Sequence, residues 1–366
     1  MSNNSSDIAA STLLWFANEK AAEVNYPAIV FSGAMMTLGL VGNGLVFYVY
    51  GYQFQRTPAN VYIYSLSVID LVCCVFAIPF DIFWLRFPLI YGAAIPCKIF
   101  TTISLAAYTS QILLIICISR DRYYKICYPM KSFRIQSPNK NVLFALVLAL
   151  CLSSPSFVVH GTKKIKMAVP GVVATTCSFD ESLDHRVPVI YFGLCLSLAI
   201  ADLLVLLFVY ISIIRVVYRR SRNNLVYSTG VNASSIYKMS MTEQPFSNTR
   251  EYPIPRRNNE LRKRFETQVS KTSVIFLVVA ASCVFSYIPY IVIELITNVN
   301  GIDFRNHSIL VQKIMGVASM TFCISNVCNP IIYGIVNPNF RRECFRLFSC
   351  QKPARYSYAF GAKGQR

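Results

Sequence analysis

The sequence predicts an all-α membrane protein: a bundle of seven transmembrane helices. Of its 366 residues, 54% are hydrophobic and only 14% are charged, whereas a soluble domain averages about 45–50% and about 25%. The few charges lie between long apolar stretches, and each stretch reaches the roughly 20 residues that a helix needs to cross about 30 Å of hydrocarbon. These stretches are apolar throughout rather than alternating, which disfavours a membrane β-barrel.

Seven such stretches follow one another along the chain. Two of them carry isolated acids, 57–85 with Asp70 and Asp81, and 187–214 with Asp202. The other five contain no Asp, Glu, Lys or Arg, and they are 24–55, 99–119, 141–162, 272–293 and 314–340.

The basic residues predict the orientation of the bundle. Ten Lys and Arg lie in 219–264, six in 120–140 and seven after Phe340. With seven spans these segments share one side, which the positive-inside rule makes cytoplasmic, so the N-terminus is outside. No cleavable signal peptide is expected, because the first residues are polar. Most of the net charge of +18 then faces anionic inner-leaflet lipid. Division of the charge among short loops disfavours nucleic acid as a partner.

The expected organisation has an extracellular tail at 1–25 and a helical bundle at 26–336. Within the bundle, 219–262 is polar and rich in Ser, Asn, Arg and Pro, which predicts a disordered third intracellular loop. The residues after the bundle, which end in a tail at 349–366, are expected to be cytoplasmic.

A β-hairpin is predicted in the second outer loop. Pro170 and Gly171 suit a turn, and β-branched residues flank them; an unstructured loop is the alternative. Cys97 and Cys177 both fall on the predicted outer side, where an oxidising environment allows a disulfide. Sequence alone does not establish the pairing of these two cysteines.

Three sequons and one cysteine are candidate modification sites. Asn3, Asn4 and Asn306 head Asn-x-Ser sequons on the predicted outer side, although such triplets also occur by chance. Cys350, like Cys344, follows the last span among basic and aromatic residues, which favours palmitoylation over a free thiol only weakly.

Polar residues in the predicted spans need partners, because each costs on the order of 2.5–3.5 kcal/mol to insert. Asp70, Asn43 and Asn329 lie within spans, and Pro330 bends the last one. One interpretation is that these residues form a polar cluster that holds a water network or a cation. The other is that they only form hydrogen bonds that join neighbouring helices.

A charged triplet, Asp121-Arg122-Tyr123, ends the third span at the cytoplasmic face. The guanidinium can pair with its neighbouring carboxylate or with another partner, and two alternative partners make a switch. An ordinary Arg that snorkels at a helix end is the alternative.

Together these landmarks resemble the rhodopsin-like (class A) G-protein-coupled receptors over roughly residues 27 to 345. Cys97 and Arg122 are separated by 25 residues, as in that family. Phe340 follows Tyr333 by seven residues and matches the start of the family's short amphipathic eighth helix, so the resemblance implies such a helix at 337–348. The matching residues appear in the family's order: Gly42-Asn43, Leu66-x3-Asp70, Cys97 with Cys177, Asp121-Arg122-Tyr123, Tyr210, Pro289 and Asn329-Pro330-x-x-Tyr333.

The resemblance implies a receptor and not an enzyme. An extracellular agonist would open the cytoplasmic ends of spans five and six, and a heterotrimeric G protein would dock there. Arg122 would then release Asp121, while Tyr210 and Tyr333 move inward. Arrestin and receptor kinases are further implied partners. No cofactor is implied beyond an allosteric sodium ion, in a sodium and water site formed by Asn43, Asp70, Gln111, Asn326 and Asn329.

The chain also departs from the family's pattern. Asp202 replaces the span-five Pro, Tyr287 the span-six Trp, and Cys283 the Phe one turn below. Gln111 replaces a small hydroxyl near Asp70, and its bulk would fill the sodium cavity. These departures predict altered basal activity or altered sodium sensitivity.

The ligand class is narrowed by exclusion. Amine receptors carry an Asp where this chain has Ser104, and opsins carry a Lys where it has Cys323. The expected hairpin is similar to that of peptide receptors. Acids in a pocket would bind a cationic ligand group, and aromatic rings would add cation–π contact; anchoring at the headgroups is the alternative. The candidate pocket residues are Asp81, Ser104, Tyr108, Tyr287, Tyr290 and Glu294.

Three functions remain for comparison. A receptor for a neuropeptide or peptide hormone is favoured. A receptor of the same fold for a lipid, nucleotide or other small molecule is the alternative, with Lys163, Lys164 and Lys166 available to an anionic ligand. An atypical, poorly signalling receptor is a variant of either. A seven-span transporter is disfavoured, because the chain shows no internal duplication.

Overall fold

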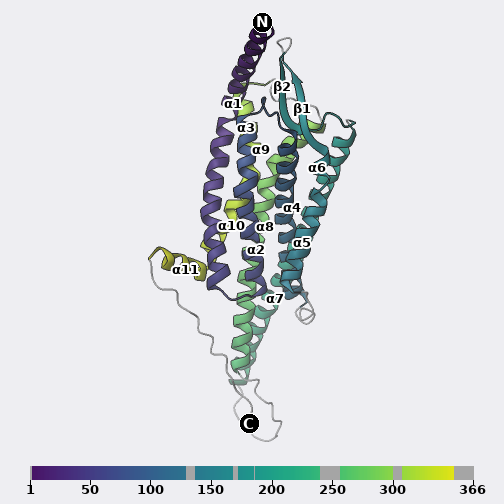
Figure 1. Cartoon of the computed structure of the whole chain (residues 1–366). Coiled ribbons are helices and arrows are strands. Elements are labelled where there is room, and N and C mark those ends of the chain that lie inside the picture. Colours follow the sequence, from purple (N-terminus) through teal and green to yellow (C-terminus); the bar gives the residue numbers. More distant parts are fainter. Residues whose placement is uncertain are drawn as a thin grey trace, which may run out of the picture.

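Seven helical segments long and apolar enough to cross a membrane form the body of the protein. The computed structural model describes residues 2–128, 137–167, 172–184, 186–239, 256–299 and 307–349. Within this part of the chain the seven segments coincide with the seven predicted stretches, and they pack side by side in one bundle (Figure 1). The predicted fold class is therefore confirmed.

Several spans consist of more than one helical element. The second combines α2, η2 and α3, and the last combines α9, η5 and α10. The elements are α1 (Ser2–Tyr48), η1 (Val49–Gln53), α2 (Pro58–Val72), η2 (Cys73–Ala77), α3 (Ile78–Arg86), α4 (Ala94–Cys127), α5 (Pro138–Ser153), α6 (Ser156–Val159), β1 (His160–Lys166), β2 (Val173–Phe179), α7 (Arg186–Met239), α8 (Arg256–Val299), α9 (Ile309–Ser319), η5 (Thr321–Cys323), α10 (Ile324–Val336) and α11 (Pro338–Phe348).

Local signals explain where helices begin. The Thr57 side chain accepts a hydrogen bond from the Asn60 amide at the start of α2, with Pro58 in the first turn. Asn337 caps α11 in the same way, and Pro338 follows it. The amphipathic helix expected at 337–348 is therefore present, and Figure 1 shows it set apart from the bundle at the end opposite the N-terminus.

The bundle has a buried apolar core, and its outer surface also carries apolar side chains. Leu114, Ile118 and Phe276 are buried within its core, whereas Val30, Phe208 and Phe285 are each more than 60% exposed. Apolar side chains on such an outer surface suit hydrocarbon rather than water.

Two glycines of the first span allow close packing, one against the last span and one against the second. A Cβ atom on Gly42 would lie only 2.8 Å from the ring of Pro330. Gly39, one turn earlier on α1, faces the Cys74 sulfur, which a Cβ would meet at 2.6 Å. Glycine at these two positions permits the close helix packing that is typical of membrane bundles.

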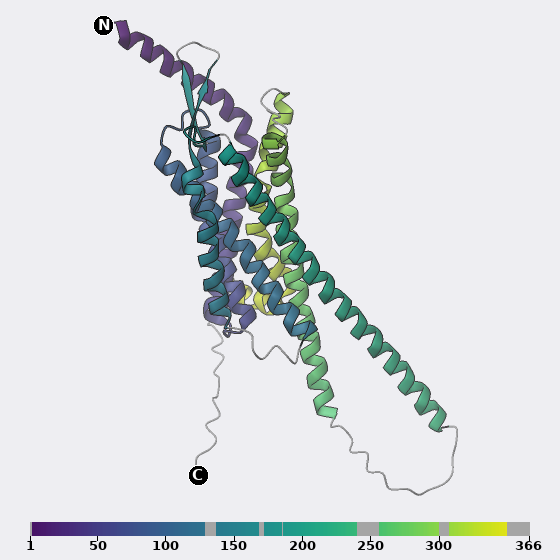
Figure 2. The ribbon, with the colours of Figure 1, turned by 90° about the vertical axis from the view of Figure 1, so that its right-hand side faces the viewer.

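The N-terminal residues differ from the expected tail at 1–25, because α1 begins at Ser2 and continues unbroken into the first span (Figure 2). Asn18, fully buried, donates to the Arg86 carbonyl oxygen at 3.3 Å and accepts from the Leu89 amide at 3.1 Å. Glu19 forms an ion pair with Arg86 at 2.8 Å. These contacts hold the N-terminal extension of α1 against the end of α3.

The third intracellular loop also differs from expectation. We expected disorder over 219–262, but α7 continues to Met239 and α8 begins at Arg256. Figure 2 shows both helices extending beyond the bundle. Residues 240–255 lie outside the described part of the chain.

The predicted hairpin is present at the same end of the bundle as the N-terminus. Strands β1 and β2 are antiparallel, with His160 opposite Phe179 and Lys166 opposite Val173. The expected turn at Pro170-Gly171 lies outside the described residues. Thr175 of β2 also accepts a hydrogen bond from the Tyr91 amide at 2.9 Å.

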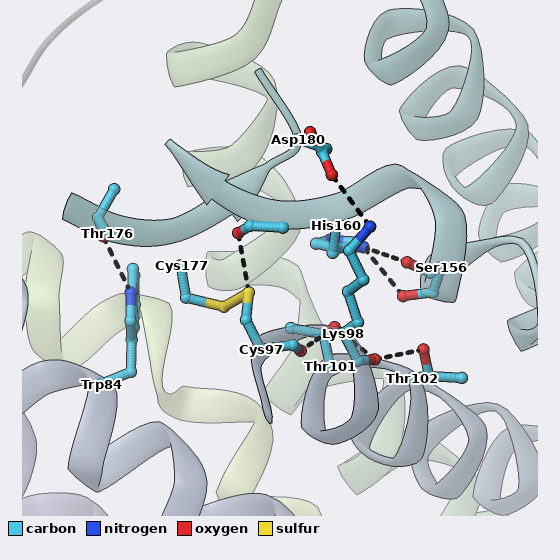
Figure 3. Close-up of a disulfide and its surroundings, with 11 residues drawn as sticks. Trp84, Cys97, Lys98, Thr101, Thr102, Ser156, His160, Thr176, Cys177 and Asp180 are labelled. Carbon is cyan, nitrogen blue, oxygen red and sulfur yellow. Dashed lines mark hydrogen bonds and ion pairs between the residues drawn. A yellow bond between two sulfur atoms is a disulfide. The ribbon is translucent and has the colours of Figure 1, made fainter. Parts of the chain in front are cut away.

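A disulfide and an ion pair attach the hairpin to α4 (Figure 3). Cys97 and Cys177 are bonded, with Cα atoms 5.6 Å apart. Lys98 Nζ lies 3.0 Å from Asp180 Oδ2. Hydrogen bonds from Ser182 and then from Lys98 lower the pKa of Asp180 to about 2. This carboxylate therefore stays charged through the physiological range.

His160 lies where α6 meets β1. Its Nδ1 is 2.9 Å from Ser156 Oγ, and its ring packs against Phe179 and Tyr191 at centroid distances of 5.1 and 6.0 Å. Burial lowers the pKa of His160 from its ordinary value of 6.5, although the Ser156 carbonyl partly opposes this shift. The fold therefore favours the neutral ring.

Acidification is predicted to destabilise the folded protein through His160. Because its pKa is lowered in the folded state, the stabilisation is complete above pH 6.5 and declines as pH falls below that value toward the lowered pKa. The Tm of the purified protein should fall more between pH 7.5 and 5.5 in the wild type than in His160→Asn. His307→Asn, the same replacement at an exposed position, is the control variant. Equal slopes for wild type and His160→Asn would contradict the assignment.

Candidate functional site

The centre of the bundle contains a buried carboxylate with two amide donors. Gln111 Nε2 donates to Asp70 Oδ1 at 2.5 Å, and Asn329 Nδ2 donates to Asp70 Oδ2 at 2.8 Å. The three side chains come from α2, α4 and α10, and all are nearly or fully buried. Each carboxylate oxygen thus has a partner, as burial requires.

Two more asparagines extend this cluster to the first span. Gln111 Nε2 also donates to Asn326 Oδ1 at 3.1 Å. Asn43 Nδ2 donates to the Asn326 backbone oxygen at 2.7 Å and to Gly39 O at 3.1 Å. The structure therefore brings together the five residues that the sequence suggested for a sodium and water site.

Gln111 connects the cluster to the sixth span. Its Oε1 accepts hydrogen bonds from Ser325 Oγ at 3.3 Å and from the Tyr287 hydroxyl at 3.4 Å. The sequence suggested Gln111 only as bulk near Asp70. Its role as the residue that contacts four polar groups at once was not foreseen.

A second group, between the polar cluster and the hairpin, combines a carboxylate with aromatic rings. The Tyr108 hydroxyl donates to Asp81 Oδ2 at 3.4 Å. The Phe322 ring lies 4.9 Å from Tyr108, 5.4 Å from Tyr290 and 6.2 Å from Tyr287 between centroids. These four aromatic rings and Asp81 are called the aromatic cluster below.

Two residues predicted for the ligand pocket, Ser104 and Glu294, have no described contact with the aromatic cluster. Ser104 lies one turn before Tyr108 on α4, is buried, and its hydroxyl has no partner within the described residues. Glu294 lies on α8, but its side chain is outside the described part of the chain. Phe322, which the sequence analysis missed, is central to the cluster. Its only signal was its place before Cys323 in span seven.

At the opposite end of α4, Arg122 is held by its neighbour. Its Nε and Nη2 lie 3.1 and 2.5 Å from Asp121 Oδ2, and both side chains are buried. Lys125 Nζ shares the same oxygen at 2.9 Å. The guanidinium also lies over the Phe276 ring, 5.4 Å from its centroid.

The three tyrosines predicted to act with Arg122 lie in different surroundings from one another. The Tyr210 hydroxyl accepts from Ser119 Oγ at 3.0 Å and donates to the Phe276 carbonyl oxygen at 2.9 Å, so it joins α4 to α8. The Tyr333 ring is 6.0 Å from Tyr50, and its hydroxyl has no partner in the described residues. Tyr123 lies apart from both, among the aromatic side chains Tyr124, Tyr128 and Phe208.

One polar contact near this end was not predicted. Asn141, almost fully buried at the start of α5, donates to the Tyr62 hydroxyl at 2.9 Å. Its Oδ1 accepts from Arg120 Nη2 at 2.9 Å. A polar residue at the start of an apolar run was the only signal for this contact.

The predicted modification sites are not described by the structure. Asn3 and Asn4 lie in α1, but their side chains are outside the described part. Asn306 and Cys350 lie outside the described residues altogether.

Comparison with known proteins finds one family and relatives that are all receptors. The family described as "7 transmembrane receptor (rhodopsin family)" matches residues 42–333. The chain is 26% identical to neuromedin-U receptor 2 of Mus musculus over 47% of its own length and 45% of that receptor. It is 22% identical to the QRFP-like peptide receptor of Branchiostoma floridae, over 88% of this chain and 77% of that one. It is 23% identical to the pyroglutamylated RF-amide peptide receptor of Mus musculus, over 92% and 73%.

Proposed function

The chain belongs to the rhodopsin family of seven-transmembrane receptors, and from this premise we propose that it binds an extracellular peptide and activates a heterotrimeric G protein. Membership in this family makes the chain a receptor rather than an enzyme. It also makes it a multi-pass protein of the plasma membrane with an extracellular N-terminus. The hairpin and the N-terminal part of α1 are then extracellular, and α11 is cytoplasmic.

The proposed ligand is a peptide with a cationic residue. The three relatives reported above are named for peptides, and one of them for RF-amide peptides. An arginine and a phenylalanine amide together carry a guanidinium group and an aromatic ring. The aromatic cluster contains matching groups, because Asp81 is a carboxylate among the rings of Tyr108, Tyr290 and Phe322. This arrangement is the observation that carries the proposal, since a guanidinium pairs with carboxylate and packs on aromatic faces.

The contacts suggest how ligand binding on the outside changes the cytoplasmic end of the bundle. Tyr287 packs near Phe322 on one side and donates to Gln111 on the other. A ligand that moves Tyr287 therefore moves α8 relative to α4. Since Tyr210 holds α8 through the Phe276 carbonyl, the same movement breaks that bond and frees Arg122 from its place over the Phe276 ring. Arg122 then leaves Asp121 and engages the G protein.

Further partners and modifications complete the proposal. Receptor kinases would phosphorylate serines and threonines of the segment 219–262, and arrestin would bind the phosphorylated form. Glycans on Asn3, Asn4 and Asn306 and a palmitoyl group on Cys350 agree with the orientation.

An anionic lipid or small molecule is the second candidate. Lys163 and Lys164 are exposed on β1, directly above the extracellular end of the bundle. Lys166 belongs to the same strand, but its side chain is outside the described residues.

The ligand class is tested by measuring calcium and cyclic AMP in cells that express the chain. Tissue extract is applied before and after protease treatment. A response that proteolysis abolishes supports a peptide agonist, which fractionation then isolates. A response that survives contradicts the peptide proposal and favours the second candidate. Vector-transfected cells provide the background.

Asp81→Asn is predicted to weaken the isolated peptide agonist by about 10–100-fold, because a hydrogen bond to a charged group contributes about 1.5–3 kcal/mol. The measurement is EC50 at matched surface expression. Glu181→Gln removes an exposed extracellular acid and serves as the control. If both variants keep wild-type potency, Asp81 does not bind the cationic group.

Arg122→Ala is predicted to abolish G-protein activation while ligand binding persists, since Arg122 lies at the cytoplasmic end and the aromatic cluster does not include it. Two quantities are measured in the same cells: binding of the labelled peptide agonist that fractionation isolates, and second-messenger output. Arg56→Ala, which removes an exposed basic residue of the first intracellular loop, is the comparison. Retained signalling in Arg122→Ala would contradict the proposed coupling role.

A further inference from the structure

We propose that the side-chain amide of Gln111 takes the place of a cation beside Asp70, so that this receptor has no sodium site and a small hydroxyl at position 111 would create one. The inference concerns the polar cluster at the centre of the bundle. It does not depend on the identity of the ligand or on G-protein coupling.

The amide nitrogen lies where a cation would have to bind. Gln111 Nε2 is 2.5 Å from Asp70 Oδ1 and 3.1 Å from Asn326 Oδ1. A sodium ion that bound the Asp70 carboxylate together with Asn326 would need the same two oxygens. Each of these oxygens directs a lone pair at an amide hydrogen, so the amide nitrogen lies at the position that bridges the two oxygens.

The orientation of the amide follows from its four partners. The nitrogen faces two acceptors, the Asp70 and Asn326 oxygens. The oxygen accepts from the Tyr287 hydroxyl at 3.4 Å and lies 3.3 Å from the Ser325 hydroxyl, whose shorter contact, 2.8 Å, is to the Phe322 carbonyl oxygen. The reverse orientation would place a carbonyl oxygen against two acceptors in a buried site, at the full cost of unsatisfied groups. The donor end therefore points at Asp70.

The other oxygen of this carboxylate also accepts an amide hydrogen bond. Asp70 Oδ2 already accepts from Asn329 Nδ2 at 2.8 Å. Hard cations bind through oxygen ligands, and an amide NH2 group offers none. Since Gln111 and Asp70 are both fully buried, the side chain has no solvent-exposed position to move to. The residues present do not fit a sodium ion.

The same residues would fit one if the amide were removed. Gln111→Ser would free Asp70 Oδ1 and Asn326 Oδ1 and release the Ser325 hydroxyl from the Gln111 oxygen. The new hydroxyl would add a further oxygen. Water entering the vacated volume would complete the coordination.

The test measures thermal stability of the purified full-length receptor in detergent and requires no agonist. Tm is recorded in 150 mM NaCl, KCl and choline chloride, so that ionic strength is constant. Wild type is expected to show equal Tm in the three salts. Gln111→Ser is expected to gain a sodium-specific rise of about 2–4 °C, because binding to the folded state alone stabilises it.

Matched variants identify the site of the effect. Gln111→Ser combined with Asp70→Asn keeps the vacated volume but removes the carboxylate charge, and should lose the sodium-specific rise. A sodium-specific rise in the wild type that Asp70→Asn abolishes would overturn the proposal. So would a folded Gln111→Ser receptor whose Tm is the same in all three salts. If Gln111→Ser does not fold, the wild-type and Asp70→Asn measurements still decide whether the native chain binds sodium.

Discussion

The hydrogen bonds to the Asp70 carboxylate are the constraint on which the rest of the bundle depends. Burying a carboxylate without partners costs far more than the few kcal/mol by which a protein is stable. Its two oxygens accept from Gln111 and Asn329. The Gln111 amide also donates to Asn326, whose backbone oxygen accepts from Asn43. Four spans are thereby held in one relative position, because each contributes a group that no other span can supply.

The groups proposed for ligand binding and for coupling lie on either side of this cluster. Tyr287 connects it to Phe322 and the aromatic cluster. Toward the cytoplasm, Tyr210 ties α8 to α4, and Arg122 rests on Phe276 of α8. Both sides meet on the sixth span, which contributes Tyr287 above and Phe276 below. Movement of α8 relative to α4 therefore changes contacts at both ends together.

Sequence predicted the spans and the hairpin, because hydropathy and turn residues act locally, and the resemblance to the family implied the eighth helix. It also predicted that Asp70, Asn43 and Asn329 need partners, since polar groups within a membrane are costly. It did not predict that the residues before Tyr26 are helical. Asn18, within this segment, contacts Arg86 and Leu89, which are distant in the sequence. Nor did it predict Phe322 or the contact of Asn141 with Tyr62. Such long-range partners leave no pattern in a single chain.

Two departures from the family's pattern are the two ends of one interaction. Tyr287 stands where the family has Trp, and Gln111 stands where it has a small hydroxyl. A tyrosine hydroxyl within the bundle needs an acceptor, and Gln111 Oε1 provides it at 3.4 Å. A small hydroxyl at position 111 would be too short to provide that acceptor and to donate to Asp70 at the same time. The long amide does both, so the two unusual residues support each other, and the group that supports Tyr287 is the same group that occupies the place of a cation.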